Sequence, residues 1–260
     1  MQEMTRIALA LYLGHLLTDF VFQTSRMVGL KRAGKFQGYL QHGAVHYAAA
    51  LVLGGFFVPG MLWSWRFQLV LALLTAVHVV IDGAKITLGA RYAVVDGTWG
   101  FTIDQIFHAG TVFLAAWWIA GGPPAAEIAR VLGILRRPDN KILLLMVVYV
   151  AVIFGAGYLI RSLTRPLMRD LKISESHAQL SNAGMFIGWL ERFLILSALI
   201  EHSPATAGLI LAAKSIARYP EFKRQQFAEY FLIGTLLSIS AAILGGVVLL
   251  KVIHGNAGLP

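Results

Sequence analysis

The feature that most constrains this chain is a series of apolar segments, each long enough to cross a membrane as a helix. A hydrocarbon core of ~30 Å requires roughly 17 to 25 apolar residues in helical form. Hydrophobic side chains make up 57% of the 260 residues and charged ones only 13%, which excludes a soluble globule. We therefore predict an all-α, polytopic integral-membrane helix bundle with about seven or eight transmembrane helices. The segments lie at about residues 6–23, 42–58, 66–88, 101–120, 141–161, 183–200 and 228–250.

Residues 204–219 decide between seven and eight helices. This run is short for a span and carries Lys214, so it is either a brief span with a snorkelling lysine or a re-entrant element. If residues 204–219 cross the membrane, one side of the membrane carries twice as many Lys and Arg residues as the other. The positive-inside rule therefore favours eight helices, with both termini outside and residues 24–41 as a cytoplasmic loop. The net charge of +9 is interpreted in the same way, and no nucleic-acid partner is expected.

A polar stretch divides the apolar segments into two groups. It contains Gly-Gly-Pro-Pro at 121–124. We predict a four-helix membrane unit at 1–122, a loop at 123–140 and a second set of membrane helices at 141–260.

Four pairs of ligand-type side chains recur in the first unit. The members of each pair are four residues apart and therefore share one helix face. The pairs alternate between the end and the start of their apolar segments, and successive spans cross the membrane in opposite directions. All four pairs are therefore expected in one layer of the membrane. The distribution of Lys and Arg residues places that layer on the cytoplasmic side. The pairs are His15 and Asp19, His42 and His46, His78 and Asp82, and Asp104 and His108.

The order of the pairs also repeats along the chain. His78 follows His15 by 63 residues, and His108 follows His46 by 62. We predict that two duplicated helical hairpins form the first half, related by an axis along the membrane normal as in parallel-repeat transporters.

The eight paired side chains are of the kind that binds divalent metals. The chain has no Cys, so thiolate ligands and cysteine nucleophiles are excluded. Eight N and O groups exceed the needs of one tetrahedral ion and suit two ions, with zinc favoured and iron or manganese compatible. The structural alternative is that these residues only hydrogen-bond neighbouring helices.

Side chains near the pairs could complete such a site. Gln23 extends the face of His15 and Asp19, and Gln105 could orient a ligand. Lys85 follows Asp82 by three residues. We predict that Lys85 and Gln23 bind an anionic substrate; the alternative for Lys85 is a snorkelling interface lysine.

A second polar group follows residue 180. Glu191 lies near the centre of its apolar segment and needs a partner. Since Arg192 points about 100° away, Lys214 or Arg218 is the better candidate. We predict a structural network around Glu191 and Arg192; alternatively, Lys214 and Arg218 bind an anionic head group.

In combination, these motifs resemble a bacterial integral-membrane family known as domain of unknown function 3307. The resemblance covers about the first 120 residues, and the segments around Glu191 and Lys214 resemble the C-terminal extension of its longer members. It implies that the paired residues act together in the bacterial inner (cytoplasmic) membrane, and it names no reaction. The matching patterns are His-x3-Asp-Phe-x2-Gln at 15–23, His-x3-His at 42–46, His-x3-Asp-x2-Lys at 78–85 and Asp-Gln-x2-His at 104–108.

These residues favour a metal-dependent membrane hydrolase acting on a lipid-linked or membrane-delivered anionic substrate. Metal would activate water, and Asp19, Asp82 or Asp104 would take its proton. A divalent-metal or proton-coupled transporter is the alternative that the repeat and Glu191 favour. A membrane di-iron oxidoreductase and a non-catalytic scaffold remain further alternatives.

Overall fold

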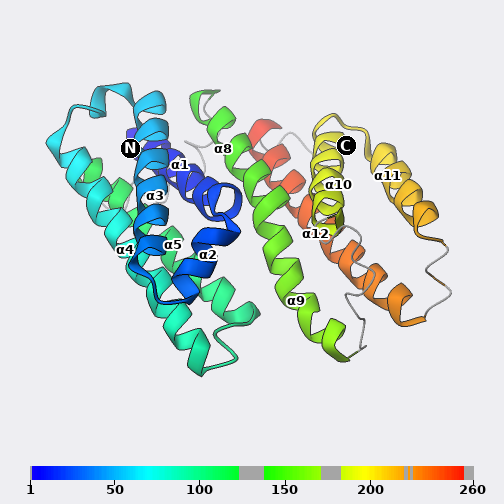
Figure 1. Ribbon diagram of the computed structural model, residues 1–260. Coiled ribbons are helices and arrows are strands. Elements are labelled where there is room, and N and C mark those ends of the chain that lie inside the picture. The colour runs from blue at the N-terminus through cyan, green and yellow to red at the C-terminus, as the bar shows by residue number, and fades with distance from the viewer. Residues whose placement is uncertain (1, 123–137, 171–182, 220–221, 223–224, 255–260) are drawn as a thin grey trace. The chain divides into compact units, whose positions relative to one another are not determined.

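The computed structural model describes residues 2–122, 138–170, 183–219, 222 and 225–254. Every regular element in those ranges is a helix, as Figure 1 shows. The chain divides into two compact units, Met1–Val147 and Val148–Pro260. The all-α prediction is confirmed.

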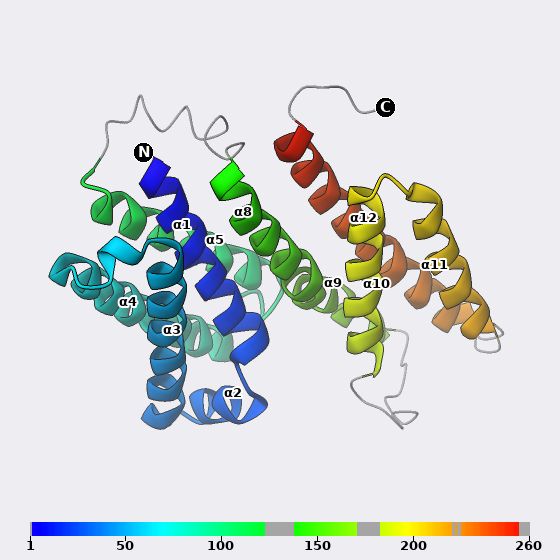
Figure 2. The same ribbon diagram turned by 90° about the horizontal axis from the view of Figure 1, so that it is seen from above.

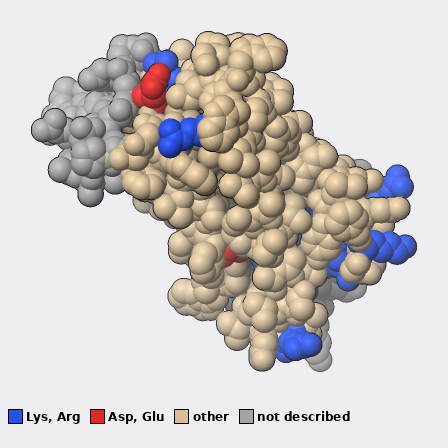
Figure 3. Space-filling view, turned by 90° about the vertical axis from the view of Figure 1, so that its left-hand side faces the viewer, with Lys and Arg blue, Asp and Glu red and all other residues tan. Residues whose placement is uncertain are grey.

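Four helices within the described residues are long and apolar enough to cross a membrane. These are Glu3–Phe22, Trp65–Arg91, Asn140–Pro166 and Phe227–Ile253. The face seen in Figure 3 is mostly uncharged, with Lys and Arg near its margins. Such a face suits contact with lipid tails, which are as apolar as the side chains on it. The chain therefore has the make-up of a helical membrane protein.

Four long helices form the bundle of the first unit: α1 (Gln2–Leu17), α3 (Phe36–Phe57), α4 (Trp65–Arg91) and α5 (Thr98–Ile119). Helices α1 and α4 each pack against both α3 and α5, so the four surround a common interior (Figure 2). One end of that interior is apolar. It is filled by buried side chains that include Met4, Leu11, Phe67, Leu71 and Val112.

The first helix changes its winding before it ends. α1 continues without a break into a π-helix, η1 (Thr18–Phe22), which includes Asp19. The Thr18 hydroxyl donates a 2.7 Å hydrogen bond to the Gly14 carbonyl at this transition. Because a π-turn changes the rotation of the residues that follow, Asp19 points in a different direction from the one a straight α-helix would give it.

Residues 24–41, predicted as a loop between two spans, include a short helix, α2 (Ser25–Arg32), and the first residues of α3. The Thr24 hydroxyl caps the start of α2 by accepting from the Met27 N–H at 3.2 Å. Gly34, at φ 68°, ends it in a Schellman motif in which the N–H groups of Gly34 and Lys35 bond to the Lys31 and Leu30 carbonyls. α2 packs against α3 and α4, across the end of the bundle where α1 leads into α3 (Figure 2).

The second unit contains the end of α8 (Pro138–Val150), the π-helix η3 (Ala151–Gly155), and α9 (Ala156–Asp170). It continues with α10 (Ala183–Ile200), α11 (Pro204–Ala217) and α12 (Gln225–His254). α10 packs against α11 and α12, and α12 packs against α9. The predicted loop at 123–140 lies mostly outside the described residues. With 14 residues, α11 is about 21 Å long, which is shorter than a ~30 Å hydrocarbon core.

Candidate metal centre

The bundle of the first unit brings the predicted ligands to one place. Each long helix presents its pair of side chains to the interior, as the four-residue spacing requires. Seven of the eight predicted ligands fall into three overlapping groups, and within each group the ligand atoms lie within 4.8 Å of one another. The groups are His15, His78 and His108; Asp19, His42, His78 and Asp82; and Asp82, Asp104 and His108.

The group of four, here called position A, has the spacing of a tetrahedral metal site. Oδ1 of Asp19 lies 3.3 Å from Nε2 of both His42 and His78, and Oδ2 of Asp82 lies 3.3 Å from Nε2 of His42. Zinc bonds of about 2.0–2.1 Å place tetrahedral ligand atoms about 3.3 Å from one another. The two histidine nitrogens, at 2.8 Å, would need to separate by about 0.5 Å to fit that geometry.

A second group, here called position B, lies against the first and shares Asp82 with it. Nε2 of His108 is 3.6 Å from Oδ1 of Asp82 and 3.4 Å from Oδ1 of Asp104. The two oxygens of Asp82 therefore face different positions, as in a carboxylate that bridges two ions. Position B has three candidate protein ligands, which is the number that catalytic zinc sites take from the protein.

Several buried polar atoms in this cluster have no hydrogen-bond partner. They belong to five of the predicted ligands and are His15 Nδ1, Asp19 Oδ1, His46 Nε2, Asp104 Oδ1 and His108 Nε2. An unsatisfied buried donor or acceptor costs about 1–3 kcal/mol, so native proteins rarely leave several together. Each of these atoms can donate electrons to a metal, so the donor set fits a divalent cation.

Two lysines provide the positive charge within the cluster. Lys31, at the end of α2, is only 3% exposed, and its Nζ lies 2.5 Å from Oδ2 of Asp82. Lys85 on α4 places its Nζ 2.8 Å from Oδ2 of Asp104 and keeps a third of its side chain exposed. Lys31 was not predicted as a site residue, because a basic residue between two spans was interpreted only as evidence for the orientation of the chain in the membrane. The Thr24 cap and Gly34 stop were the signals that could have revealed α2.

Polar neighbours orient the imidazoles. Gln23 lies 3.2 Å from Nδ1 of His42, and Oε1 of Gln105 lies 3.3 Å from Nε2 of His15. Gln23 therefore contacts a predicted metal ligand, His42. Its predicted contact with substrate stays a prediction. His46, which lies outside the three groups, stacks on His78 with ring centroids 4.2 Å apart and contacts the Thr75 hydroxyl.

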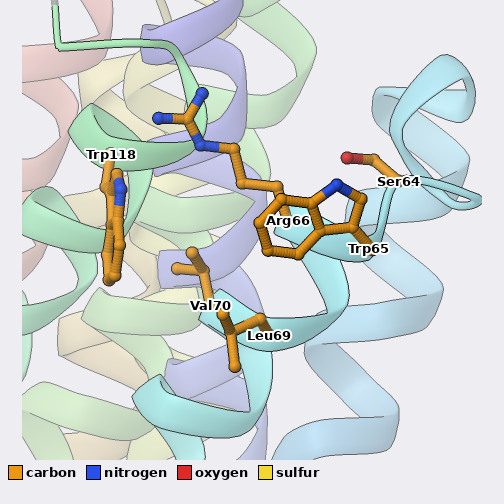
Figure 4. Close-up of a pocket in the computed structure, with 6 residues that line it drawn as sticks. All are labelled: Ser64, Trp65, Arg66, Leu69, Val70 and Trp118. Carbon is orange, nitrogen blue, oxygen red and sulfur yellow. The ribbon is translucent and has the colours of Figure 1, made fainter.

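A pocket of the first unit lies elsewhere. It has a volume of about 470 Å³ and lies at the start of α4 and the end of α5 (Figure 4). Arg66 in its wall is 16 residues before Asp82, which is about 24 Å along α4. The pocket is therefore separate from the metal centre. Its lining residues are Ser64, Trp65, Arg66, Leu69, Val70 and Trp118.

The second unit holds the other predicted network. Glu191 is buried and pairs with Lys214 of α11, so Lys214 already has an anionic partner within its own unit. Arg192 is not part of that pair. Its guanidinium donates to the Ile153 carbonyl in η3 at 2.6 and 3.1 Å and to the Ser238 hydroxyl at 3.3 Å. Arg218 follows α11 as its C-cap.

The fold and the site together define a helical membrane protein with a buried cluster of histidine and carboxylate side chains. Residues 7–126 match the family described as "Protein of unknown function (DUF3307)", so this part of the chain is similar to that family. The match includes all eight predicted ligands and both lysines. No curated protein and no solved structure matches the chain.

Proposed function

We propose that this protein is a metal-dependent membrane hydrolase whose first unit holds up to two divalent ions at positions A and B. Zinc is favoured, and iron or manganese is compatible with the same nitrogen and oxygen ligands. In this proposal the substrate is anionic and is lipid-linked or delivered by the membrane. The protein lies in a bacterial inner membrane with seven or eight spans, and its two metal-binding hairpins arose by duplication.

The observation that carries the proposal is the set of unsatisfied ligand atoms in a buried layer. Hydrogen bonding between helices would pair these atoms at good geometry, whereas five of the predicted ligands each keep one buried atom without a hydrogen bond. Four of these atoms meet a neighbouring ligand atom only as an ion-pair contact at 3.3–3.8 Å. Ligand-to-ligand distances of 3.3 Å at position A support the same interpretation. A scaffold that used these residues only for packing would not need this arrangement.

The closed side of the cluster favours an enzyme over a transporter. The interior beyond the histidines is filled by the apolar residues of the bundle core, among them Leu71 and Val112. An ion crossing the first unit would have to leave a polar layer for this dry region, which is costly. The described residues of the first unit therefore support a site that opens toward one side.

The chain's own residues can perform the steps of a hydrolysis. A divalent ion would supply Lewis acidity, which makes water nucleophilic near neutral pH. Asp104 would accept the proton that the attacking water releases through Oδ2, the oxygen that Lys85 contacts and that does not face His108. His15 and His46 fill the layer behind the ligands, and the stacking of His46 on His78 fixes the orientation of that ring.

Metal analysis of the purified protein tests this proposal. We expect zinc, iron or manganese at one to two equivalents per chain in wild type. In Asp82→Asn, which loses the shared carboxylate, affinity should fall by more than the 10–100-fold typical of outer-shell changes.

Asp96→Asn is the matched control, because Asp96 is an exposed carboxylate between α4 and α5. It should retain the wild-type metal content. Wild-type protein that takes up none of the three metals, even when they are added after purification, would contradict the proposed function.

A further inference from the structure

The two lysines of the cluster approach it from different elements. Lys31 comes from α2, which crosses the end of the bundle, and Lys85 comes from α4, one turn beyond Asp82. Each ammonium group is paired with a carboxylate that is also a predicted metal ligand. The same carboxylates face His108 through their other oxygens.

A buried ammonium group needs an anionic partner. Lys31 is only 3% exposed, so losing its ion pair without a replacement would leave an uncompensated charge in a low-dielectric layer. Metal at position A would bind Oδ2 of Asp82, which is the oxygen that Lys31 now contacts. Metal and lysine therefore compete for one carboxylate, and metal binding deprives Lys31 of its partner.

The formal charges lead to the same conclusion. With neutral imidazoles, three carboxylates face two ammonium groups, which leaves one negative charge in the metal-free cluster. Two divalent ions would change this to three positive charges. A cluster with that charge, buried in apolar surroundings, requires an anion of high charge, and a phosphate group meets the requirement better than a carboxylate does.

The exposure of the side chains shows where such an anion can enter. A third of the Lys85 side chain is exposed, whereas His15, His42 and His78 are almost completely buried. Gln23 is half-buried next to His42. Lys85 and Gln23 therefore mark the accessible side of the ligand layer, whereas Lys31 is buried.

We propose that Lys31 and Lys85 form a phosphate-binding pair: metal at position A releases Lys31 from Asp82, and the partly exposed Lys85 joins it in holding a phosphate group of the substrate. This inference rests on the proposed function and specifies its substrate class. Phosphate on a soluble ester and phosphate on a lipid head group share this chemistry.

The test measures metal and phosphate binding to the full-length protein in phosphatidylcholine nanodiscs. Zinc is titrated first, and inorganic phosphate is then titrated into the zinc-loaded and the metal-free protein. We expect phosphate to bind only after zinc. Lys31→Met and Lys85→Met should each weaken phosphate binding by about ten- to a hundredfold, as expected for loss of a charged hydrogen bond.

Zinc affinity provides a second readout with the opposite sign. Lys31→Met removes the group that competes for Asp82, so zinc should bind more tightly than in wild type. Lys31→Arg keeps the charge and should restore part of the phosphate binding. Lys35→Met is the matched control, because Lys35 is exposed at the start of α3. It should change neither affinity.

Parallel nanodiscs that contain phosphatidic acid distinguish the two sources of phosphate. Competition with inorganic phosphate by this lipid identifies a head-group substrate, and its absence identifies a soluble one. Unchanged phosphate binding in zinc-loaded Lys31→Met and Lys85→Met would overturn the inference and leave the metal site standing. Equal phosphate binding with and without zinc would also overturn it. Absence of zinc binding in wild type would overturn the proposed function as well.

Discussion

If the cluster binds metal as proposed, the contact between His78 and His108 sets the order in which two ions can bind. Their Nδ1 atoms are 3.1 Å apart, and a hydrogen bond between them needs a proton on only one. A metal on Nε2 of His78 would leave the proton of His78 on Nδ1, where it is donated to Nδ1 of His108. A neutral His108 would then carry its own proton on Nε2. That nitrogen faces Asp82 and Asp104, so position B cannot fill until this proton leaves or the ring turns over.

We therefore expect zinc to bind in two steps, with position A filling first and position B filling more weakly and releasing more protons. Calorimetry in buffers of different ionisation enthalpy measures both. His108→Ala should remove the second step and keep the first, and His202→Ala in the second unit serves as the control. A single step with two equivalents of zinc would show that the two positions fill together.

Asp19 separates a catalytic metal from a structural one. Asp19→Asn keeps the size of the side chain and one oxygen ligand but removes a negative charge and a proton acceptor. If the site is catalytic, hydrolysis of a phosphate ester should fall by at least about 10²-fold, while metal content and melting temperature stay near wild type. Parallel loss of metal, stability and activity across several ligand variants would instead indicate a structural ion.

At the scale of elements, α2 positions Lys31 through a close backbone contact. A Cβ atom at Gly38 would lie 2.7 Å from the Lys31 backbone nitrogen, so only glycine lets α2 approach α3 this closely. Gly38→Ala should push the end of α2 outward and reproduce the phosphate-binding defect of Lys31→Met, with zinc still bound.

Gly29→Ala is the matched control for this effect. Gly29 lies inside α2, and a Cβ atom added there would have no neighbouring atom within 4 Å, so alanine meets no obstacle. It should stabilise α2 by roughly 0.5–1 kcal/mol and leave phosphate binding intact. Equal effects of the two substitutions on phosphate affinity would show that the close contact at Gly38 does not position Lys31.

The elements were predictable to different degrees. Apolar runs located the long helices, because a span needs a fixed length of apolar sequence. The apolar run that begins at residue 42 is shorter than α3, which starts at Phe36. Polar residues in the first turns of α3 lower the hydropathy there without breaking the helix. The π-helix around Asp19 could not be predicted, because it depends on how α1 packs against its neighbours rather than on local composition.

For the site, the four-residue spacing indicated which side chains share a helix face. It did not indicate which of them meet across helices. That Lys31 pairs with Asp82, 51 residues later, depends on the path of α2 over the bundle. His46 has the same spacing as the others, yet it stacks behind His78, because its depth in α3 places it one turn beyond the layer of ligand atoms.

At the scale of the whole molecule, the proposed metal site and the buried ion pair belong to different units. All predicted ligands lie within Met1–Val147, whereas Glu191 and Lys214 lie within Val148–Pro260. Glu191→Gln should destabilise the second unit by at most about 3–5 kcal/mol, because it leaves a partly buried ammonium group without its partner. Metal content should remain that of wild type.

Thermal unfolding combined with metal analysis measures both effects. The double variant Glu191→Gln/Lys214→Met should recover most of the lost stability, since removing both partners leaves no unpaired charge. Loss of metal from Glu191→Gln without loss of stability would mean that Glu191 itself contributes to the metal site.

The apolar core behind the histidines has a kinetic consequence. Because the apolar core closes one side of the ligand layer, substrate and product would share one entrance. A released phosphate would have to leave before the next substrate could bind. Under the proposed function, phosphate in the surrounding medium would therefore inhibit hydrolysis competitively. If the proposed hydrolysis takes place, a cell that accumulates phosphate would thereby slow it without any dedicated regulatory site.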